Sequence, residues 1–422
     1  MSNKIQSIRG MHDFAPAEAG AMRSLENKLI AVLNRYAYQE IRTPIVEKLE
    51  LFKRSIGEVT DIVEKEMYAF EDRGGDWLAL RPEGTASTVR AGIQHGWLHN
   101  QQQRLWYIGP FFRRERPQKG RYRQFHQLGV EVYGIPGPDI DVELIILTRA
   151  MLKAVGLNAD KLELQINSLG DIEARNQHRK QLIAYLSDFE NLLDDDARRR
   201  LHSNPLRILD SKNPEIQKVV ENAPRLMDVL GEEAKQHFEL LQTMLVQQNI
   251  SYVVNPTLVR GLDYYNRTVF EWVTRELGAQ GTVCAGGRYD TLIEQAGGRS
   301  TPAIGFALGL ERLQSLVESE SAETQAGIDA YVVTLGQQAT DRAFELLEII
   351  RSELPDLAIQ MNCGGGSIKT QMKRADKSGA RLALILGEEE MQRQEITVKY
   401  LQTSESQQVV KQDQIVKLLK DI

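Results

Sequence analysis

The sequence predicts a mixed α+β fold, with a large N-terminal part and a smaller α/β unit at the C-terminus. Three observations support this prediction. Residues 77–134 are rich in Trp, Tyr, Phe and Val and are interrupted by Gly and Pro, which is typical of strands joined by turns. Residues 171–249 carry charged helical runs without glycine-rich loops. Beyond residue 327, strand-like and helix-like segments alternate.

The first predicted element is an amphipathic helix over residues 15–38, which begins near Pro16 because proline fits the first turn of a helix. Its apolar residues follow helical spacing and form one stripe: Met22, Leu25, Leu29, Val32, Leu33 and Tyr36. Pro44 stops any helix, so residues 40–46 are predicted to be extended.

The length of 422 residues makes two or three domains the expectation, and the later elements suggest two. Strands are predicted at residues 268–273 and 304–309, on either side of the glycine-rich stretch 278–298. Residues 316–327 are small and polar, which indicates a linker. After it we expect strands at 330–335, 357–361, 381–386 and 396–401, and helices at 341–354, 367–378 and 412–422. The expected domains are 1–320, with a helical insertion at about 171–250, and 328–422.

Composition narrows the class of protein. A hydrophobic fraction of 42% with 26% charged residues excludes wholesale disorder. Cys284 and Cys363 lie in no CxxC or Cys/His cluster, so we expect reduced thiols and no structural metal. No segment has the length and apolarity of a signal peptide or membrane helix, so a cytoplasmic protein without membrane contact is expected. A net charge of −6 argues only weakly against nucleic acid, because local patches govern encounter.

Polar residues share faces with aromatic ones on two predicted strands around residues 106–134. Side chains alternate between faces in a strand. The second strand therefore places Phe125, Gln127, Gly129, Glu131 and Tyr133 on one face, opposite the more apolar His126, Leu128, Val130 and Val132. Solvated faces of antiparallel strands are the commoner reason for such alternation. The mixture of Phe, Gly, Gln and Glu instead favours a sheet that binds a ligand.

Two further segments have the same pattern. Phe111, Arg113 and Glu115 share one parity on the first strand, and Arg81, Glu83 and Thr85 do so if a strand continues that far. Because a buried, unpaired carboxylate is costly, we expect Glu83 and Glu131 to meet a cation or a ligand.

Glycine- and arginine-bearing segments complete the candidate site. In TPAIGFALGLERL, the start of a helix carries Arg312, and an arginine beside helix N–H groups suits a phosphate. On spacing alone, packing glycines and a surface arginine are the more common reason for this pattern. RGLDYYN adds Arg260, Tyr264 and Tyr265, and GGRYD adds Tyr289.

Five motifs in order make the chain similar to class II histidyl-tRNA synthetases of the bacterial type. The helix before EIRTPIVE resembles motif 1 of the class. The segment WYIGPFFRRERPQKGRYRQFHQLGVEV resembles motif 2, and AIGFALGLERL resembles motif 3. RGLDYYN and AGGRYD resemble segments distinctive of the histidyl enzymes. Each class motif is degenerate alone, whereas all five in this order are highly specific.

The resemblance implies a fold and an activity. The fold would be an antiparallel sheet of six strands with flanking helices, a helical insertion and a C-terminal α/β anticodon-binding domain, in a homodimer built partly through motif 1. The activity would be ATP-dependent conversion of L-histidine to histidyl-adenylate, assisted by Mg²⁺, followed by transfer of histidine to the 3′ end of tRNA(His).

The resemblance also assigns roles by position. Arg113 and Arg312 would hold the ATP phosphates, and Arg260 would approach the α-phosphate. Phe125 would stack on adenine, with Glu115 near its amino group. The histidine pocket would comprise Glu83, Thr85 and Gln127 at the α-ammonium, Glu131 and Tyr265 at the imidazole, and Tyr264 and Tyr289 along its wall. The acceptor stem of tRNA would meet the loop with Arg116, Gln118, Lys119, Arg121 and Arg123.

Three other functions agree with parts of the sequence. A histidine-sensing regulatory subunit of ATP phosphoribosyltransferase is the nearest of these, but the complete basic loop and the domain after Gly327 favour a synthetase. Another class II synthetase is disfavoured by Glu131 with the pair Tyr264–Tyr265. An RNA-binding protein without catalysis would leave Arg113 and Arg312 unexplained.

Overall fold

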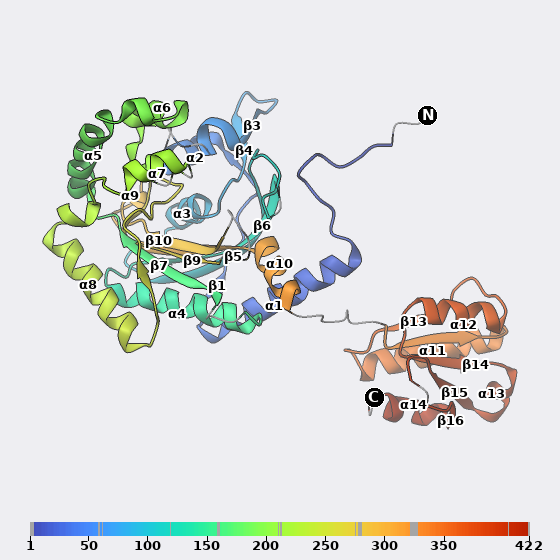
Figure 1. The fold of residues 1–422 in the computed structure, drawn as a ribbon. Helices are drawn as coiled ribbons and strands as arrows, with labels where there is room; N and C mark the ends of the chain where they lie inside the picture. The colour runs from blue at the N-terminus through green and yellow to red at the C-terminus, as the bar shows by residue number, and fades with distance from the viewer. Residues whose placement is uncertain are drawn as a thin grey trace. The chain divides into compact units, whose positions relative to one another are not determined.

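The computed structural model describes residues 4–420, apart from 58, 59, 61, 119, 158–160, 210, 212, 275, 277–280, 321–327 and 404. The chain forms two compact units, Met1–Glu323 and Thr324–Ile422. Both contain a sheet with helices packed against it (Figure 1). No helix among the described residues is long and apolar enough to cross a membrane.

The first unit is built on an eight-stranded sheet in the order β1-β5-β6-β11-β10-β9-β7-β8. The six central strands pair antiparallel, as the resemblance implies, and the short strands β1 and β8 add a parallel partner at each edge. The strands are β1 (Gln39–Glu40), β5 (Gln103–Phe112), β6 (Gln124–Tyr133), β7 (Glu163–Ser168), β8 (Val253–Val254), β9 (Asn266–Val273), β10 (Thr282–Arg288) and β11 (Ala303–Gly309).

Helices cover one face of this sheet and form the main core. They are α1 (Pro16–Arg35), α4 (Pro138–Ala154), α8 (Glu232–Gln247) and α10 (Leu310–Glu320). The predicted first helix is confirmed: Met22, Leu25, Leu29, Val32 and Leu33 are buried, and Tyr36 packs beside them. Leu128, Val130 and Val132 of β6 join this core, so the opposite side of β6 faces away from it. That side carries the candidate site.

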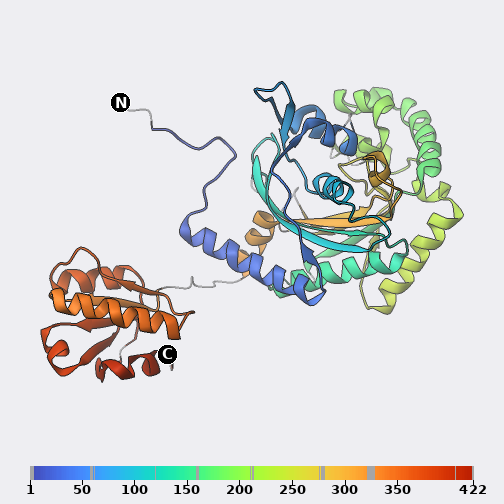
Figure 2. The same ribbon diagram turned by 180° about the vertical axis from the view of Figure 1, so that it is seen from behind.

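The other face of the sheet is covered by α3 (Thr85–Gln94) and α9 (Leu292–Gln295), with a second core cluster between them and the sheet. A small sheet, in the order β2-β4-β3, and helix α2 (Leu49–Ile56) lie near α3 (Figure 2). Its strands are β2 (Val46–Lys48), β3 (Tyr68–Glu71) and β4 (Trp77–Leu80).

The predicted continuation of a strand through Arg81, Glu83 and Thr85 is wrong. Strand β4 ends at Leu80, and Thr85 begins helix α3. Pro82 has no amide for a strand ladder. The Glu83 carboxylate instead accepts hydrogen bonds from the backbone N–H groups of Thr85 (2.5 Å) and Ala86 (2.9 Å), which satisfies free donors of the helix N-terminus.

The insertion is helical and has its own core. It contains α5 (Ile172–Ser187), α6 (Asp195–Ser203) and α7 (Pro214–Val220), followed by α8. Leu182, Leu186, Leu201 and Ile216 are buried together at its centre. Its last helix, α8, leaves this cluster and packs on the main core.

The second unit has five strands in the order β13-β12-β14-β15-β16. Strand β12 pairs parallel with β13 and β14, whereas β15 pairs antiparallel with its two neighbours. The strands are β12 (Ala330–Thr334), β13 (Ile359–Met361), β14 (Leu382–Leu386), β15 (Glu395–Tyr400) and β16 (Gln408–Lys411). The helices are α11 (Gln337–Glu353), α12 (Ile368–Lys377), α13 (Glu388–Arg393) and α14 (Ile415–Lys420). The predicted four strands and three helices are present; β16 and α13 are additional.

A buried ion pair ties β10 to α4. The Arg288 Nε donates to one oxygen of the Asp141 carboxylate at 3.1 Å, and the guanidinium forms an ion pair with the other oxygen at 2.7 Å; neither side chain is exposed. His237 of α8 reaches the same carboxylate at 2.8 Å. Burial opposes ionisation of Asp141, but Arg288 and His237 outweigh it, so the pKa of Asp141 is lowered.

Asp141→Ala should therefore lower the free energy of unfolding by about 3 kcal/mol, because it removes the closer and fully buried partner of the Arg288 cation and leaves only Asp290, at 3.3 Å. Chemical denaturation of both proteins measures the difference. Lys218→Ala is the control, since it breaks a pair with Glu215 whose side chains are 70% and 65% exposed. That control should change stability by less than about 1 kcal/mol; equal effects of the two substitutions would contradict the assignment.

Candidate active site

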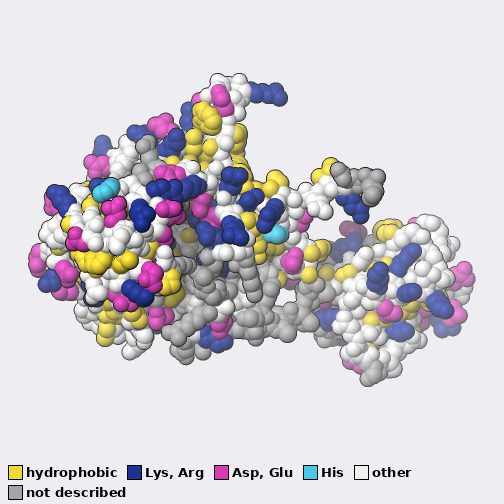
Figure 3. Space-filling view, turned by 45° about the horizontal axis from the view of Figure 1, so that its top comes forward, with side chains coloured by type: hydrophobic (Ala, Val, Ile, Leu, Met, Phe, Trp, Pro, Cys, Tyr) yellow, Lys and Arg dark blue, Asp and Glu magenta, His cyan; other side chains and the backbone are white. Residues whose placement is uncertain are grey.

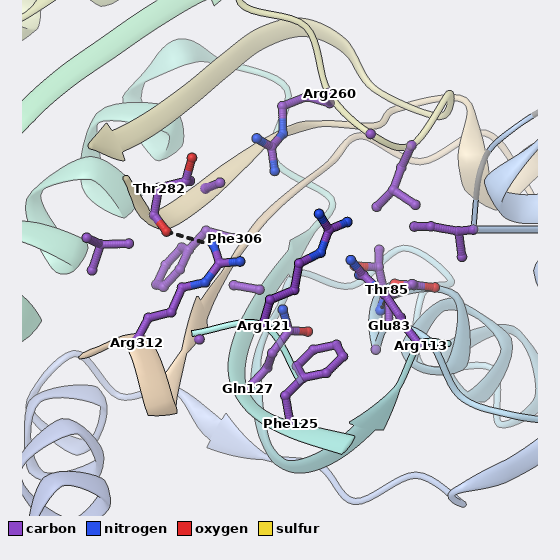
Figure 4. Close-up of a pocket in the computed structure, with 18 of the residues that line it drawn as sticks. Glu83, Thr85, Arg113, Arg121, Phe125, Gln127, Arg260, Thr282, Phe306 and Arg312 are labelled. Atoms are coloured by element: carbon purple, nitrogen blue, oxygen red, sulfur yellow. Dashed lines mark hydrogen bonds between the residues drawn. The ribbon is translucent and has the colours of Figure 1, made fainter. Parts of the chain in front are cut away.

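A polar pocket opens on the face of the main sheet that α1 and α4 leave uncovered. Eleven of the residues predicted for the site lie along its walls: Glu83, Thr85, Arg113, Glu115, Arg121, Phe125, Gln127, Arg260, Tyr264, Tyr265 and Arg312. Figure 4 shows that Arg260 and Arg312 approach from one side, Arg113 and Glu83 from the other, and Phe125 and Gln127 from β6. The structure thus brings distant motifs to one place.

Glu131 and Tyr289 do not line this pocket themselves; Glu131 is 1% exposed and lies behind Thr85 and Tyr107, two residues of its wall. Its carboxylate accepts hydrogen bonds from the hydroxyls of Thr85 (2.7 Å), Tyr107 (3.0 Å) and Tyr289. Burial raises the pKa of Glu131 to about 8, although these three hydroxyls favour its ionised form. The sequence led us to expect a cation or a ligand beside Glu131; within the described residues its hydrogen-bond partners are three neutral hydroxyls.

Glycines create the space for this carboxylate. Gly305 of β11 lies opposite Glu131, and a Cβ there would overlap the carboxylate itself. Gly129 is the cross-strand partner of Tyr107, and a Cβ at Gly129 or Gly84 would overlap the Tyr107 ring. A single glycine on the polar face of β6, Gly129, therefore leaves room for the Tyr107 ring.

Three tyrosines form an aromatic wall around Glu131. The ring centroids of Tyr264 and Tyr265 lie 4.6 Å apart, and those of Tyr264 and Tyr289 lie 5.6 Å apart at 67°. All three side chains are buried. Burial raises the pKa of each phenol, so each remains a neutral hydrogen-bonding group.

The arginines are held by backbone carbonyls and by carboxylates. Arg113 donates to the carbonyl of Pro82 at 2.9 Å, and its guanidinium lies 5.4 Å from the centre of the Phe125 ring. Arg312 donates to the carbonyls of Gly120 (2.9 Å) and Thr282 (3.1 Å), the second of which is drawn in Figure 4. These contacts aim both side chains into the pocket.

Arg260 has an acidic partner that the sequence did not reveal. It pairs with Glu271 of β9, whose other oxygen accepts from the Thr282 hydroxyl at 3.0 Å. Burial disfavours the cation, but Glu271 and the nearby tyrosines outweigh it and raise the pKa of Arg260. Glu271 therefore keeps this arginine charged where water is scarce.

The predicted basic loop does not act as one surface. Arg116 and Gln118 are exposed, whereas Arg121 enters the pocket and pairs with Glu115 and, at 3.7 Å, with Glu66. Arg123 bonds to the backbone carbonyls of Glu115 and Arg9, both at 3.2 Å. Lys119 lies outside the described residues.

Sequence reasoning missed Tyr107, Thr282 and Glu271. Tyr107 and Thr282 line the pocket, and Glu271 lies behind Arg260. Gly129 lies directly across from Tyr107 and makes room for its ring. Recognising this pair requires knowledge of how β5 aligns with β6, which the sequence alone does not give. No sequence spacing links Glu271 to Arg260.

The side chains of the pocket suit an anionic substrate that also carries an aromatic group and an N–H donor. Four arginines line it, and Phe125 offers an aromatic face beside them. Positioned guanidinium groups stabilise phosphate charge, and a buried acceptor recognises an N–H donor. Cys284 is excluded as a nucleophile, because it is 1% exposed and burial raises its pKa well above the usual range.

The raised pKa of Glu131 predicts a pH-dependent stability. Its pKa is 4.5 in the unfolded chain and about 8 in the folded protein. Between these values the folded state holds a proton that the unfolded state has lost. The free energy of unfolding should therefore fall as the pH rises through this window, by up to about 1.4 kcal/mol per pH unit from this group.

Urea denaturation of the unmodified protein and of Glu131→Gln, in steps of about one pH unit across that window, measures this contribution. The difference between the two curves should change with pH and become constant above the folded pKa. Parallel curves would show that Glu131 is ionised in the folded protein throughout.

Comparisons with known proteins agree with this site. A family model described as histidyl-tRNA synthetase matches residues 10–313, and a model described as an anticodon binding domain matches residues 329–422. Histidine--tRNA ligase of Hydrogenovibrio crunogenus is 58% identical over 421 residues, covering 100% of this chain and 98% of that protein.

Solved structures give the same result. Apo histidyl-tRNA synthetase of S. aureus is similar with a TM-score of 0.82 and 35% identity, over 99% of this chain and 100% of that one. An ATP phosphoribosyltransferase regulatory subunit/histidyl-tRNA synthetase from Bacillus halodurans C is similar in fold, with a TM-score of 0.61 and 22% identity over 90% and 98% of the two chains. The full-length matches and the arrangement of the pocket together establish that this chain belongs to the histidyl-tRNA synthetase family.

Proposed function

We propose that this chain uses ATP to convert L-histidine to histidyl-adenylate. It then transfers the histidyl group from this intermediate to the 3′ end of tRNA(His). The observation that carries the proposal is the buried carboxyl of Glu131, hydrogen-bonded to two wall residues of an arginine-lined pocket, in a chain 58% identical over its full length to a histidine--tRNA ligase. The arginines indicate a reaction at phosphate groups. The carboxyl of Glu131 indicates a substrate with an N–H group, as in the imidazole of histidine.

In the first step, the histidine carboxylate attacks the α-phosphorus of ATP. A new oxygen–phosphorus bond forms, the bond to the β-phosphate oxygen breaks, and pyrophosphate leaves. Negative charge grows on phosphate oxygens, which Arg113, Arg260 and Arg312 are arranged to stabilise. Phe125 stacks on adenine next to Glu115. Because the arginines are already held in place, little reorganisation is needed.

Mg²⁺ supplies further stabilisation of phosphate charge in such reactions. Within the described ranges, no group of three or more His, Cys, Asp or Glu side chains could hold a metal ion. Mg²⁺ commonly binds through one or two carboxylates, several waters and the substrate phosphates. Glu115 and Glu271 already pair with Arg121 and Arg260, so we propose that the ATP phosphates and water would provide most of the ligands.

Histidine is recognised by a group of mostly buried polar and aromatic side chains. Glu131 and Tyr265 receive the imidazole, Tyr264 and Tyr289 form its wall, and Glu83, Thr85 and Gln127 surround the α-ammonium. A site built around such hydrogen bonds rejects analogues that lack them by about 10⁴-fold, because its buried polar groups are then left unpaired.

In the second step, the 3′-hydroxyl of tRNA attacks the histidyl carbonyl and AMP leaves. The exposed Arg116 and Gln118 face the acceptor stem, together with Lys119 and Arg123, while Arg121 serves the ATP phosphates from the same loop. Figure 3 shows several Lys and Arg side chains gathered near the centre of one face, among acidic ones. This local grouping permits RNA binding despite the net charge of −6.

The remaining proposals concern assembly and location. Residues 1–320 would be the catalytic domain, and residues 328–422 would bind the anticodon, where Lys369, Lys373 and Lys377 are exposed on α12. We propose that the protein is cytoplasmic and forms a homodimer. The exposed apolar side chains around the small sheet support the dimer: Ile45, Val46, Phe70 and Trp77.

Pyrophosphate exchange into ATP, with each of the twenty amino acids in turn and without tRNA, tests the proposal. Exchange with histidine alone is expected. Exchange with another amino acid would overturn the role of Glu131 and Tyr265. Histidine binding without any exchange would instead indicate a regulatory protein.

Arg260→Ala should lower the rate of adenylate formation by roughly 10²–10³-fold, the usual effect of removing one charge-stabilising donor. Histidine affinity, measured by calorimetry, should change little. The control is Arg42→Ala, since the Arg42 side chain is 84% exposed. Equal losses of adenylate formation and histidine binding would remove Arg260 from the phosphate site.

A further inference from the structure

The chain begins with an extended segment that lies beside the loop between β5 and β6. We call residues 9–14 the N-terminal strap. Figures 1 and 2 show that the chain bends next to this loop before it enters α1. Most of the strap is exposed, but Gly10 is buried. A buried glycine within an exposed segment indicates a specific contact.

The strap extends the hydrogen bonding of the hairpin beyond the strands. The carbonyl of Gly10 accepts from the backbone N–H groups of Arg123 (2.7 Å) and Gln124 (3.4 Å). Arg123 in turn accepts, through its carbonyl, from the N–H of Arg113 at 2.9 Å. The backbone of Arg123 is thereby held between the first strand of the hairpin and the strap.

Side chains reinforce this arrangement. The guanidinium of Arg123 bridges the carbonyls of Arg9, in the strap, and Glu115, on the opposite side of the loop. The His12 and Tyr122 rings meet edge to face, with centroids 4.9 Å apart. Three hydrogen bonds and one ring contact from the strap therefore converge on residues 122–124.

Only glycine fits at the centre of the strap. The φ angle of Gly10 is +86°, and a Cβ would lie 2.8 Å from Pro117 Cγ and 3.1 Å from Arg123 Cγ. Both neighbours belong to the basic loop. A side chain at residue 10 would therefore strain the backbone and push against the two ends of that loop.

We propose that the N-terminal strap is a positioning element that sets the basic loop, residues 116–123, for the acceptor end of tRNA. The inference rests on the proposed function. The strap acts on residues 122–124 through Arg123. The loop's contacts with the ATP pocket have additional anchors that do not involve the strap, since Arg121 pairs with Glu115 and Glu66, and Gly120 receives Arg312. Transfer to tRNA should thus depend on the strap more than activation does.

Gly10→Ala in the full-length protein tests this separation. We expect kcat/KM for tRNA in histidine transfer to fall about ten-fold, which corresponds to about 1.4 kcal/mol. Pyrophosphate exchange should keep its KM for histidine and for ATP. The matched control is Gly20→Ala, because a Cβ at Gly20 meets nothing within 4 Å. His12→Ala, at an exposed residue, should give a smaller loss of the same kind.

A double-mutant cycle with Arg123→Met tests the route. If the strap acts through Arg123, the two losses in transfer should be clearly less than additive. Additive losses, equal losses in transfer and exchange, or no loss in transfer would each overturn the proposal. Failure of the proposed function would look different, because the unmodified protein would then lack histidine-dependent exchange.

Discussion

The burial of one carboxyl group organises the site. Glu131 lies in the middle of β6, almost out of water, and a charge there is costly without compensation. Hydroxyls from three separate segments surround it, and glycines at residues 129 and 305 leave the room that the carboxyl and Tyr107 require. This single carboxyl group constrains three features of the fold: the start of α3, the pairing of β11 with β6 and the position of Tyr289.

Buried arginines are likewise compensated, in this case by carboxylates. Arg260 is balanced by Glu271, Arg121 by Glu115, and Arg288 by Asp141 deeper in the core. The Arg288 pair joins β10 to α4, and the Arg260 pair joins β9 to the segment before it, whereas Arg121 and Glu115 lie in the same loop. Glu271 and Asp141 raise the pKa of Arg260 and Arg288, so two of these partners favour the charged guanidinium and also connect separate segments of the fold.

Prediction from the sequence succeeded where a local pattern decides the outcome. The stripe of α1, the alternation on β6 and the strands and helices of the second unit follow from side-chain periodicity. It failed at residues 81–85, where the Glu83 carboxylate starts a helix, and at β16 and α13, which are too short for a period to be read. Tyr107 and Glu271 were missed because their importance arises from cross-strand neighbours.

By itself, the sequence determined which residue types the site contains, the order of the motifs and the faces of the longer elements. Tertiary structure decided which charges meet. It paired Glu271 with Arg260, turned Arg121 into the pocket while Arg116 stayed in solvent, and surrounded Glu131 with hydroxyls in place of a cation. The physical reason is that burial and pairing depend on contacts between segments far apart in the chain, whereas periodicity records only each residue's local direction.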